Sequence, residues 1–215
     1  MSERVLLIDS DIFVLLSAAG VLDVLINCLG FSRSNVRRLA ALPKQLERGR
    51  AFRRYDQAFR DKALACCEEF PAMVERPTSD AHLEALISVD QIDEGEAILF
   101  AKLAECNASL LATGDQRSLI ALGNADQLSL FRDKIRGRVI CLESALLLLV
   151  RSLGAEVVGK AFQRLRGVDK KIDILFGHKT EFMTEEIVRQ LSSYLTDLRG
   201  KLGDDFLANS PASGE

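Results

Sequence analysis

The chain has little of what several common kinds of site require. Its 215 residues include only two histidines, His82 and His178, and its five cysteines are scattered without a CxxC spacing. A structural zinc site needs clustered thiols and imidazoles, so none is predicted. We interpret the cysteines as free thiols, mostly in the core. Neither histidine accompanies a nucleophile motif, so a Ser-His-Asp or Cys-His arrangement is not predicted either.

Long apolar runs are also missing. The run LLLLV at 146–150 is far shorter than the roughly 20 apolar residues that cross a bilayer. The first ten residues show no secretory cleavage pattern. No glycine-rich motif of the GxxxxGK or GxGxxG type is present to cradle a phosphate. We therefore expect a cytoplasmic protein with no membrane contact.

What the chain does have is enough apolar sequence for a sizeable core. Hydrophobic residues make up 48% and charged residues 27%, which is typical of an ordered globular protein, and a length of 215 residues suits one domain with an extension or one large domain. The net charge of −3 conceals a basic segment at 33–54, which has a single acid, Glu47. This segment could contact a phosphate backbone or be a solvated helical face. Its basic residues are Arg33, Arg37, Arg38, Lys44, Arg48, Arg50, Arg53 and Arg54.

Strand-like runs alternate with helical patterns over most of the chain. Short apolar runs at 4–8, 110–113 and 138–142 read as buried strands, and each precedes a helical pattern. This alternation predicts an α/β fold, a three-layer α/β/α sandwich with a central parallel sheet. We expect a domain at 1–155, a helical C-terminal extension at 156–203 packed on it, and a disordered tail at 204–215.

The intervening segments are predicted as helices and loops. We expect one helix over 35–46, capped by Ser32 or Ser34 and kinked by Pro43, and a charged helix over 51–69. A loop bracketed by Pro71 and Pro77 follows, and Ser79 or Asp80 begins a short helix. The last helix, 180–202, is capped by Thr180 or Thr184 and either packs on the core or makes a dimer contact.

Three acids in separate strand-like contexts carry most of the functional information. Asp9 closes the first strand, Glu96 lies at the start of the helix that Asp93 opens, and Asp115 follows the strand 110–113. Carboxylates at the carboxyl ends of parallel strands can converge in one crevice. Like charges that crowd together need protons or hard divalent cations to neutralise them. The acids therefore predict a Mg²⁺ or Mn²⁺ site.

Each acid also has an expected role and a structural alternative. Asp9 and Asp115 are the expected direct ligands, and Glu96 is expected to bind a second ion or to orient a water molecule. The alternative is that the aspartates are helix N-caps and Glu96 a first-turn partner of the helix dipole. Asp93 is expected to take part in metal binding. Three further residues are expected to support the site through hydrogen bonds or charge: Asp11, Ser10 and Thr113.

The motifs resemble those of PIN-domain proteins, over roughly residues 3–153. IDSDIFVLLSAAGVLDVL resembles the opening strand and helix of that family, and DEGEAILFAKLAE its central helix. LLATGDQRSL resembles its last acidic motif, and RVICLESALLLL the strand and helix that close its core. The resemblance implies a metal-dependent ribonuclease with Asp9, Glu96 and Asp115 as catalytic acids and Mg²⁺ or Mn²⁺ as cofactor.

The resemblance has further implications for partners and one departure. It implies RNA as substrate, although a DNA-directed nuclease would use the same crevice, and for a toxin it implies an antitoxin protein and a homodimer. The chain is longer than a minimal toxin. Where the family usually has a further acid after a valine, this chain has Arg37 and Arg38. Glu47, Glu68 or Glu69 could replace that acid, the alignment could slip, or the ligand is missing. A PIN-like binding module for nucleic acid or protein, without catalysis, is the alternative.

Overall fold

A computed structural model gives the structure of residues 4–74 and 76–209. Over these residues the chain forms a five-stranded, all-parallel sheet in the order β3-β2-β1-β4-β5. Strands β1 and β5 are fully buried, as expected for a sheet covered on both faces. The central parallel sheet is confirmed. The strands are β1 (Leu6–Ile8), β2 (Val36–Leu39), β3 (Ala72–Met73), β4 (Leu110–Thr113) and β5 (Val139–Cys141).

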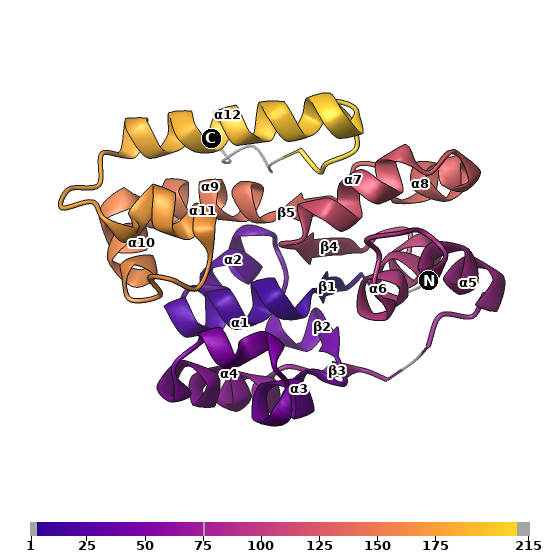
Figure 1. The fold of residues 1–215 in the computed structure, drawn as a ribbon, viewed down its shortest axis with the longest axis horizontal. Coiled ribbons are helices and arrows are strands. Elements are labelled where there is room, and N and C mark those ends of the chain that lie inside the picture. Colours follow the sequence, from indigo (N-terminus) through magenta and orange to yellow (C-terminus); the bar gives the residue numbers. More distant parts are fainter. Residues whose placement is uncertain (1–3, 75, 210–215) are drawn as a thin grey trace.

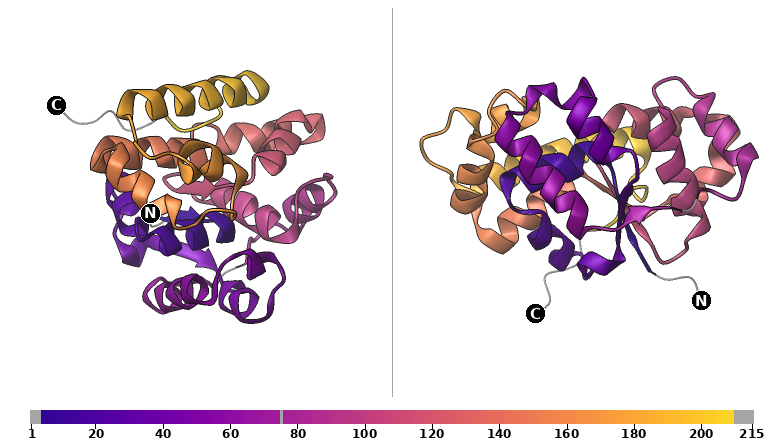
Figure 2. Two further views of the ribbon diagram at one scale, coloured as in Figure 1. Left: turned by 60° about the vertical axis from the view of Figure 1, so that its left-hand side comes forward. Right: turned by 90° about the horizontal axis from the view of Figure 1, so that it is seen from below.

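Helices cover both faces of this sheet (Figure 1). Helices α1 and α4 pack together on one face, and α5, α6 and α8 form a group on the other (Figure 2). The three-layer prediction is therefore confirmed. The α-helices before β4 are α1 (Ser10–Ala19), α2 (Leu22–Cys28), α3 (Leu42–Arg48), α4 (Gln57–Glu69), α5 (Asp80–Ile87) and α6 (Glu94–Glu105). Those after β4 are α7 (Gln116–Asn124), α8 (Ser129–Ile135), α9 (Leu142–Leu153), α10 (Ala155–Gln163), α11 (Lys170–Ile172) and α12 (Thr184–Leu202).

Shorter helical turns complete the description. The 3₁₀ turns are η1 (Arg33–Asn35), η2 (Ala51–Arg54) and η3 (Asp126–Leu128), and η4 (Asp173–Gly177) is a π-helical turn. Helix α1 ends at Gly20, whose φ of 79° lets its N–H bond back to Leu16 O at 2.9 Å. In the described ranges no single helix is long and apolar enough to cross a membrane. The pair α1 and α2 has that length and composition together, but a bend of 113° separates the two helices.

The order of the strands places a crevice beside β1. From β1 the chain proceeds to β2 and β3 on one side and then crosses to β4 and β5 on the other. The connections therefore diverge after β1 and β4, and this reversal leaves a crevice outside the carboxyl ends of the two strands. Ile8 pairs in register with Ala112, and the N–H of Asp9 donates to Ala112 O at 2.9 Å. The residues that follow the two strands consequently lie side by side.

The prediction of one helix over 35–46 is wrong. The segment instead holds the inner strand β2, a short connection and α3. Buried Val36 and Arg38 alternate with half-buried neighbours, which is the period of a strand. Arg38 is tolerated inside because its Nη2 donates to the carbonyl oxygen of Cys67 at 2.7 Å. Because a charged residue takes the place of an apolar one, the pattern of this strand is hidden in the sequence.

Smaller differences have similar local causes. The charged helix begins only at Gln57, after the turn η2, and the loop between Pro71 and Pro77 contains the two-residue strand β3. Pro43 lies in the first turn of α3, where proline needs no hydrogen-bond donor, and does not kink a longer helix. The N-cap of α12 is Met183, so in the described chain the predicted threonine caps of that helix are wrong. The predicted N-cap Ser79 is confirmed, since its Oγ accepts the N–H of His82.

The C-terminal helices pack on the rest of the fold. Helix α12 lies along α9 and α7 and buries Ile187, Leu191, Leu195 and Leu198. The tail prediction is wrong for 204–209. The side chains of Phe206 and Leu207 are 1% exposed, and the N–H of Ala208 donates to Val139 O at 2.8 Å. This segment covers the free edge of β5, which would otherwise expose unpaired backbone groups. The rest of the predicted tail, 210–215, lies outside the described residues.

Candidate functional site

The three predicted acids line one cleft. Asp9, Glu96 and Asp115 share a cleft of about 450 Å³ outside the carboxyl ends of β1 and β4, at the reversal of strand order. They come from the start of α1, the first turn of α6 and the start of α7. The sequence therefore predicted correctly that these acids share a crevice. Three other predicted site residues also line it: Ser10, Asp11 and Asp93.

Asp9 is buried and has few partners. Only 8% of the residue is exposed, and among the described residues it forms no ion pair and no side-chain cap of α1. Its Oδ2 accepts a long hydrogen bond of 3.3 Å from Thr113 Oγ1. Burial, together with repulsion from Asp11 and Asp93, raises the pKa of Asp9 to about 7. The helix-cap alternative is therefore wrong for Asp9, whose carboxylate is available to a ligand.

Glu96 combines a structural role with a raised pKa. Its N–H donates to Asp93 Oδ1 at 2.8 Å, and its Oε2 accepts the N–H of Asp93 at 2.9 Å, which is a capping box at the start of α6. The structural alternative thus holds for this pair. Burial nevertheless raises the pKa of Glu96 to about 7, and repulsion from Asp93 and Asp115 adds to the effect.

Asp115 is held by the first turn of α7. Its Oδ1 accepts the N–H of Arg117 at 2.7 Å and that of Ser118 at 3.3 Å, while its Oδ2 accepts Arg117 Nη2 at 2.9 Å. Burial favours a higher pKa, but the hydrogen bonds from the Arg117 side chain and from the two backbone N–H groups outweigh it and lower the pKa of Asp115. Asp115 is consequently ionised at neutral pH and is oriented before any ligand arrives.

Two hydroxyl groups connect and border these acids. Thr113 lies behind the cleft wall and bonds both aspartates, since its Oγ1 donates to Asp9 and accepts the N–H of Asp115 at 3.2 Å. Ser10 lines the cleft, is 8% exposed, and its Oγ is buried without a hydrogen-bond partner in the part of the chain that the structure describes. A buried hydroxyl without a partner is costly, so Ser10 points to a ligand or water at this place.

The donors suit a hard cation held by few protein ligands. Within residues 4–74 and 76–209 no three His, Cys, Asp or Glu side chains gather closely enough to hold one metal ion between them. Glu96 and Asp115 are also engaged by backbone N–H groups. Mg²⁺, however, keeps several waters and binds through one or two carboxylates. The unpaired carboxylate of Asp9, the ionised one of Asp115 and the orphaned hydroxyl of Ser10 fit an ion of that kind.

The expected fourth carboxylate is not in this cleft. Glu47, Glu68 and Glu69 do not belong to its wall as the described residues define it, and Glu69 pairs with Arg33. Gln45 of α3 lines the cleft instead. Its amide oxygen can bind a cation but carries no charge, so among the described residues the negative charge of the cleft comes from the carboxylates of Asp9, Asp11, Asp93, Glu96 and Asp115. Gln45 was not predicted as a cleft residue because one helix over 35–46 was predicted in place of β2 and α3.

The basic segment does not act as one surface. Arg38 is buried against a carbonyl group and is wrong as a phosphate contact, and Arg33 pairs with Asp23 and Glu69. Arg37 donates to the carbonyl of Val36. Among the basic side chains of the segment that the structure describes, Arg50 lines the acidic cleft. The remaining basic residues are exposed on α3 and η2: Lys44, Arg48, Arg53 and Arg54. Of these, Arg54 pairs with Asp11 at 3.2 Å.

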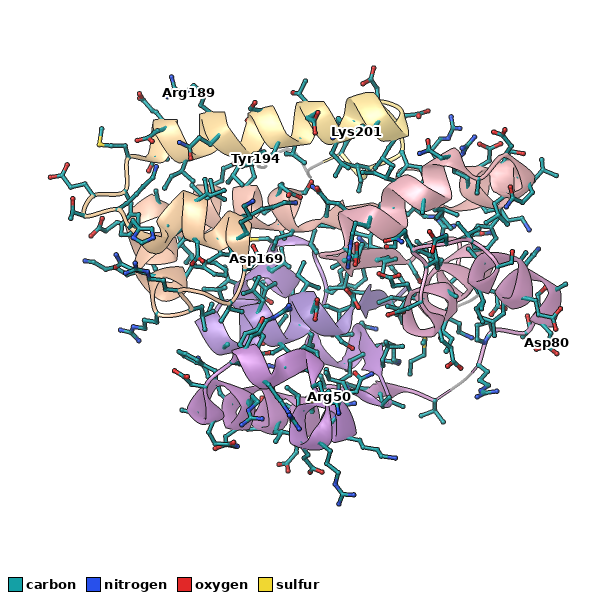
Figure 3. The ribbon with its side chains drawn as sticks, in the orientation of Figure 1. Arg50, Asp80, Asp169, Arg189, Tyr194 and Lys201 are labelled. Atoms are coloured by element: carbon teal, nitrogen blue, oxygen red, sulfur yellow. The ribbon has the colours of Figure 1, made fainter. Side chains whose placement is uncertain are left out.

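A second pocket adjoins the cleft, and both are lined by Arg117, a residue that the sequence motifs did not identify. This pocket of about 310 Å³ shares Asp11, Asp115 and Arg117 with the cleft and has Asp169 and Lys171 in its far wall. In Figure 3 the labels of Asp169 and Arg50 lie on opposite sides of α1, which separates the two regions in that view. Arg117 belongs to both hollows. Its position two residues after Asp115, in GDQR, was the available signal.

Fold and site together define an α/β protein with an acidic cleft at the reversal of strand order in its parallel sheet. No protein-family model, curated protein or solved structure matches the chain. Resemblance to PIN domains accordingly stays a prediction from sequence motifs.

Proposed function

We propose that the chain is a Mg²⁺- or Mn²⁺-dependent nuclease that hydrolyses phosphodiester bonds of RNA in this cleft. The observation that carries the proposal is the buried, unpaired carboxylate of Asp9 beside Glu96 and Asp115 at the strand-order reversal. Strongly raised carboxyl pKa values in a cleft are typical of functional sites. The proposal also includes residence in the cytoplasm.

Each residue has a role that follows from its contacts. Asp9 and the ionised Asp115 are the cation ligands, and a bound cation would acidify a water molecule and neutralise charge on the phosphoryl oxygens. Ser10 orients water or a phosphate oxygen through its unpartnered hydroxyl. Glu96, whose pKa of about 7 leaves both forms populated near neutral pH, donates a proton to the leaving oxygen when protonated or accepts one from the attacking water when ionised. Arg50, in the cleft wall, binds the RNA backbone.

A binding module without turnover is the second candidate function. The specific observation in its favour is that, among the described residues, none of the acids Glu47, Glu68 and Glu69 lines the cleft, to which α3 contributes the uncharged Gln45. Fewer charges lower cation affinity, and RNA would then bind through arginines without being cut. An antitoxin that blocks the cleft, a homodimer and a DNA substrate are further predictions from the resemblance to PIN domains.

Metal-dependent cleavage distinguishes the two functions. We expect single-stranded RNA to be cleaved in Mn²⁺, cleavage to stop with EDTA, and Asp9→Asn or Asp115→Asn to lower the rate by at least about 100-fold. Calorimetry should show Mn²⁺ binding that both variants lose. Asp197→Asn is the matched control, because Asp197 pairs with Lys201 on α12 away from the cleft. RNA binding that is indifferent to EDTA, with no cleavage at any Mn²⁺ concentration, would establish the binding module.

A further inference from the structure

Arg117 occupies the place where the hollows around the site meet. Together with Asp115 it lines the acidic cleft, the adjoining pocket, and a third hollow bordered by Asp90 and Glu96. Arg117 is the more exposed of these two residues. Its side chain is 77% exposed, whereas that of Asp115 is 23% exposed. Any strand of RNA that enters one hollow and leaves by another therefore passes Arg117.

The bonds to Asp115 divide between its two oxygens. Oδ1 caps α7 by accepting two backbone N–H groups, and these bonds do not depend on the Arg117 side chain. Oδ2 accepts Arg117 Nη2 at 2.9 Å, and Nε lies 3.5 Å from Oδ1. An ion pair this exposed holds weakly because water screens it. The guanidinium can consequently leave while Asp115 stays in position, and its departure releases Oδ2, the oxygen that a cation would need.

A cation at Asp115 changes the balance at Arg117. Cation and guanidinium compete for the same oxygen and repel each other, so binding of one weakens the other. The displaced guanidinium remains at the junction of the hollows, where a phosphate is its best partner, since its planar fork matches two phosphate oxygens. Lys171, in the neighbouring pocket, cannot replace it because it already pairs with Glu143.

We propose that Arg117 is a phosphate-positioning residue that pairs with Asp115 when no cation is bound and transfers to the RNA backbone when one binds. This inference rests on the proposed function, because it needs both the cation and the RNA. It makes cation and RNA binding mutually reinforcing, since each favours the same position of Arg117. Arg117 carries a positive charge, so it would bind the phosphate, whereas the acids of the cleft would bind the cation.

Opposite effects on the two ligands test the proposal. In calorimetry, Arg117→Ala should bind Mn²⁺ several-fold more tightly than the natural chain, because a competing positive charge is gone. In Mn²⁺ it should bind a 2′-O-methylated RNA 12-mer, which is not cleaved, about tenfold more weakly. The slope of log affinity against log salt should fall by about 0.7 in Mn²⁺ and stay unchanged in EDTA. Arg117→Lys should restore the salt slope and only part of the affinity.

The controls separate failure of this proposal from failure of the proposed function. Arg136→Ala removes an arginine that pairs with Asp133 and Asp205 outside the three hollows, and it should change neither affinity. Arg117→Ala with unchanged Mn²⁺ affinity, or with RNA binding weakened equally in Mn²⁺ and EDTA, overturns the transfer of Arg117 alone. Absence of Mn²⁺ binding by the natural chain overturns the proposed function and this inference with it.

Discussion

Two buried carboxylates that follow the carboxyl ends of strands differ in whether the fold supplies them with a countercharge. Asp9 follows β1 and Glu143 follows β5, each at the start of the next helix. Glu143 is 1% exposed, and its Oε1 accepts Gln116 Nε2 at 2.8 Å and Lys171 Nζ at 2.5 Å. Asp9 is 8% exposed and accepts a single long side-chain bond from Thr113. One acid is neutralised by the fold, and the other is left for a ligand.

The difference teaches where function resides in this fold. A buried charge is costly unless it is paired and hydrogen-bonded, so an unpaired one persists only where something else stabilises it. Lys171 comes from α11 in the C-terminal extension, and the extension therefore supplies the countercharge of Glu143. Nothing comparable approaches Asp9 in the described chain. Protonation or a cation at Asp9 is the remaining way to lower its cost.

The largest expected effect is on the stability of Asp9→Asn. The rise of the Asp9 pKa from 3.8 to about 7 corresponds to about 4 kcal/mol. Since the folded chain holds this proton more tightly than the unfolded chain, the corresponding stability is present below pH 4 and is lost as the pH rises to 7. Urea unfolding in EDTA should show Asp9→Asn to be about 4 kcal/mol more stable at pH 8 and nearly equal to the natural chain at pH 3.5. A variant less stable at pH 8 would show that Asp9 is stabilised by the fold.

Glu143 should respond in the other direction when its partner is removed. Lys171→Ala leaves a buried carboxylate without its countercharge, which costs about 3 kcal/mol for a fully buried pair and somewhat less here because Lys171 is 30% exposed. Urea unfolding at pH 7 measures the loss. Lys179→Ala is the matched control, since Lys179 pairs with Glu186, whose side chain is 41% exposed, and its loss should cost much less than that of Lys171. Equal effects of the two variants would contradict the distinction between Asp9 and Glu143.

Sequence reasoning succeeded where local pattern and topology agree. Leu110–Thr113 is the strand that was expected, and the alternation of strands and helices was enough to predict that residues after β1 and β4 meet. Asp93 was expected to open a helix, and it does so within a capping box. Which carboxylate is free could not be predicted, because Asp9 and Asp115 both follow strands and differ only in the bonds that they accept.

The errors come from contacts between distant segments. Arg38 hides an inner strand because a carbonyl group far along the chain satisfies it, and no local pattern shows that bond. Glu143 was not identified as a buried acid because its partner Lys171 lies 28 residues away, in the extension. Gln45 was not predicted in the cleft because its segment was predicted as one helix, whereas the structure has β2 followed by α3. Tertiary hydrogen bonds, which stabilise charges inside the fold, are thus what the sequence conceals.

The smallest expected effect tests the one side-chain bond that Asp9 has. Thr113→Val removes the hydroxyl that donates to Asp9 at 3.3 Å and accepts from the N–H of Asp115 at 3.2 Å. We expect a loss of about 1 kcal/mol at pH 7. Because the Thr113 bond lowers the pKa of Asp9, its removal should raise that pKa further, and the loss of stability with rising pH should continue to higher pH. Carboxyl ¹³C chemical shifts over a pH titration measure the change, and Thr113→Ser, which keeps the hydroxyl, should leave the pKa near its natural value. An unchanged Asp9 pKa in Thr113→Val would mean that the Thr113 hydroxyl does not stabilise the ionised carboxylate, and that burial, repulsion and the backbone N–H of Ser10 set its pKa.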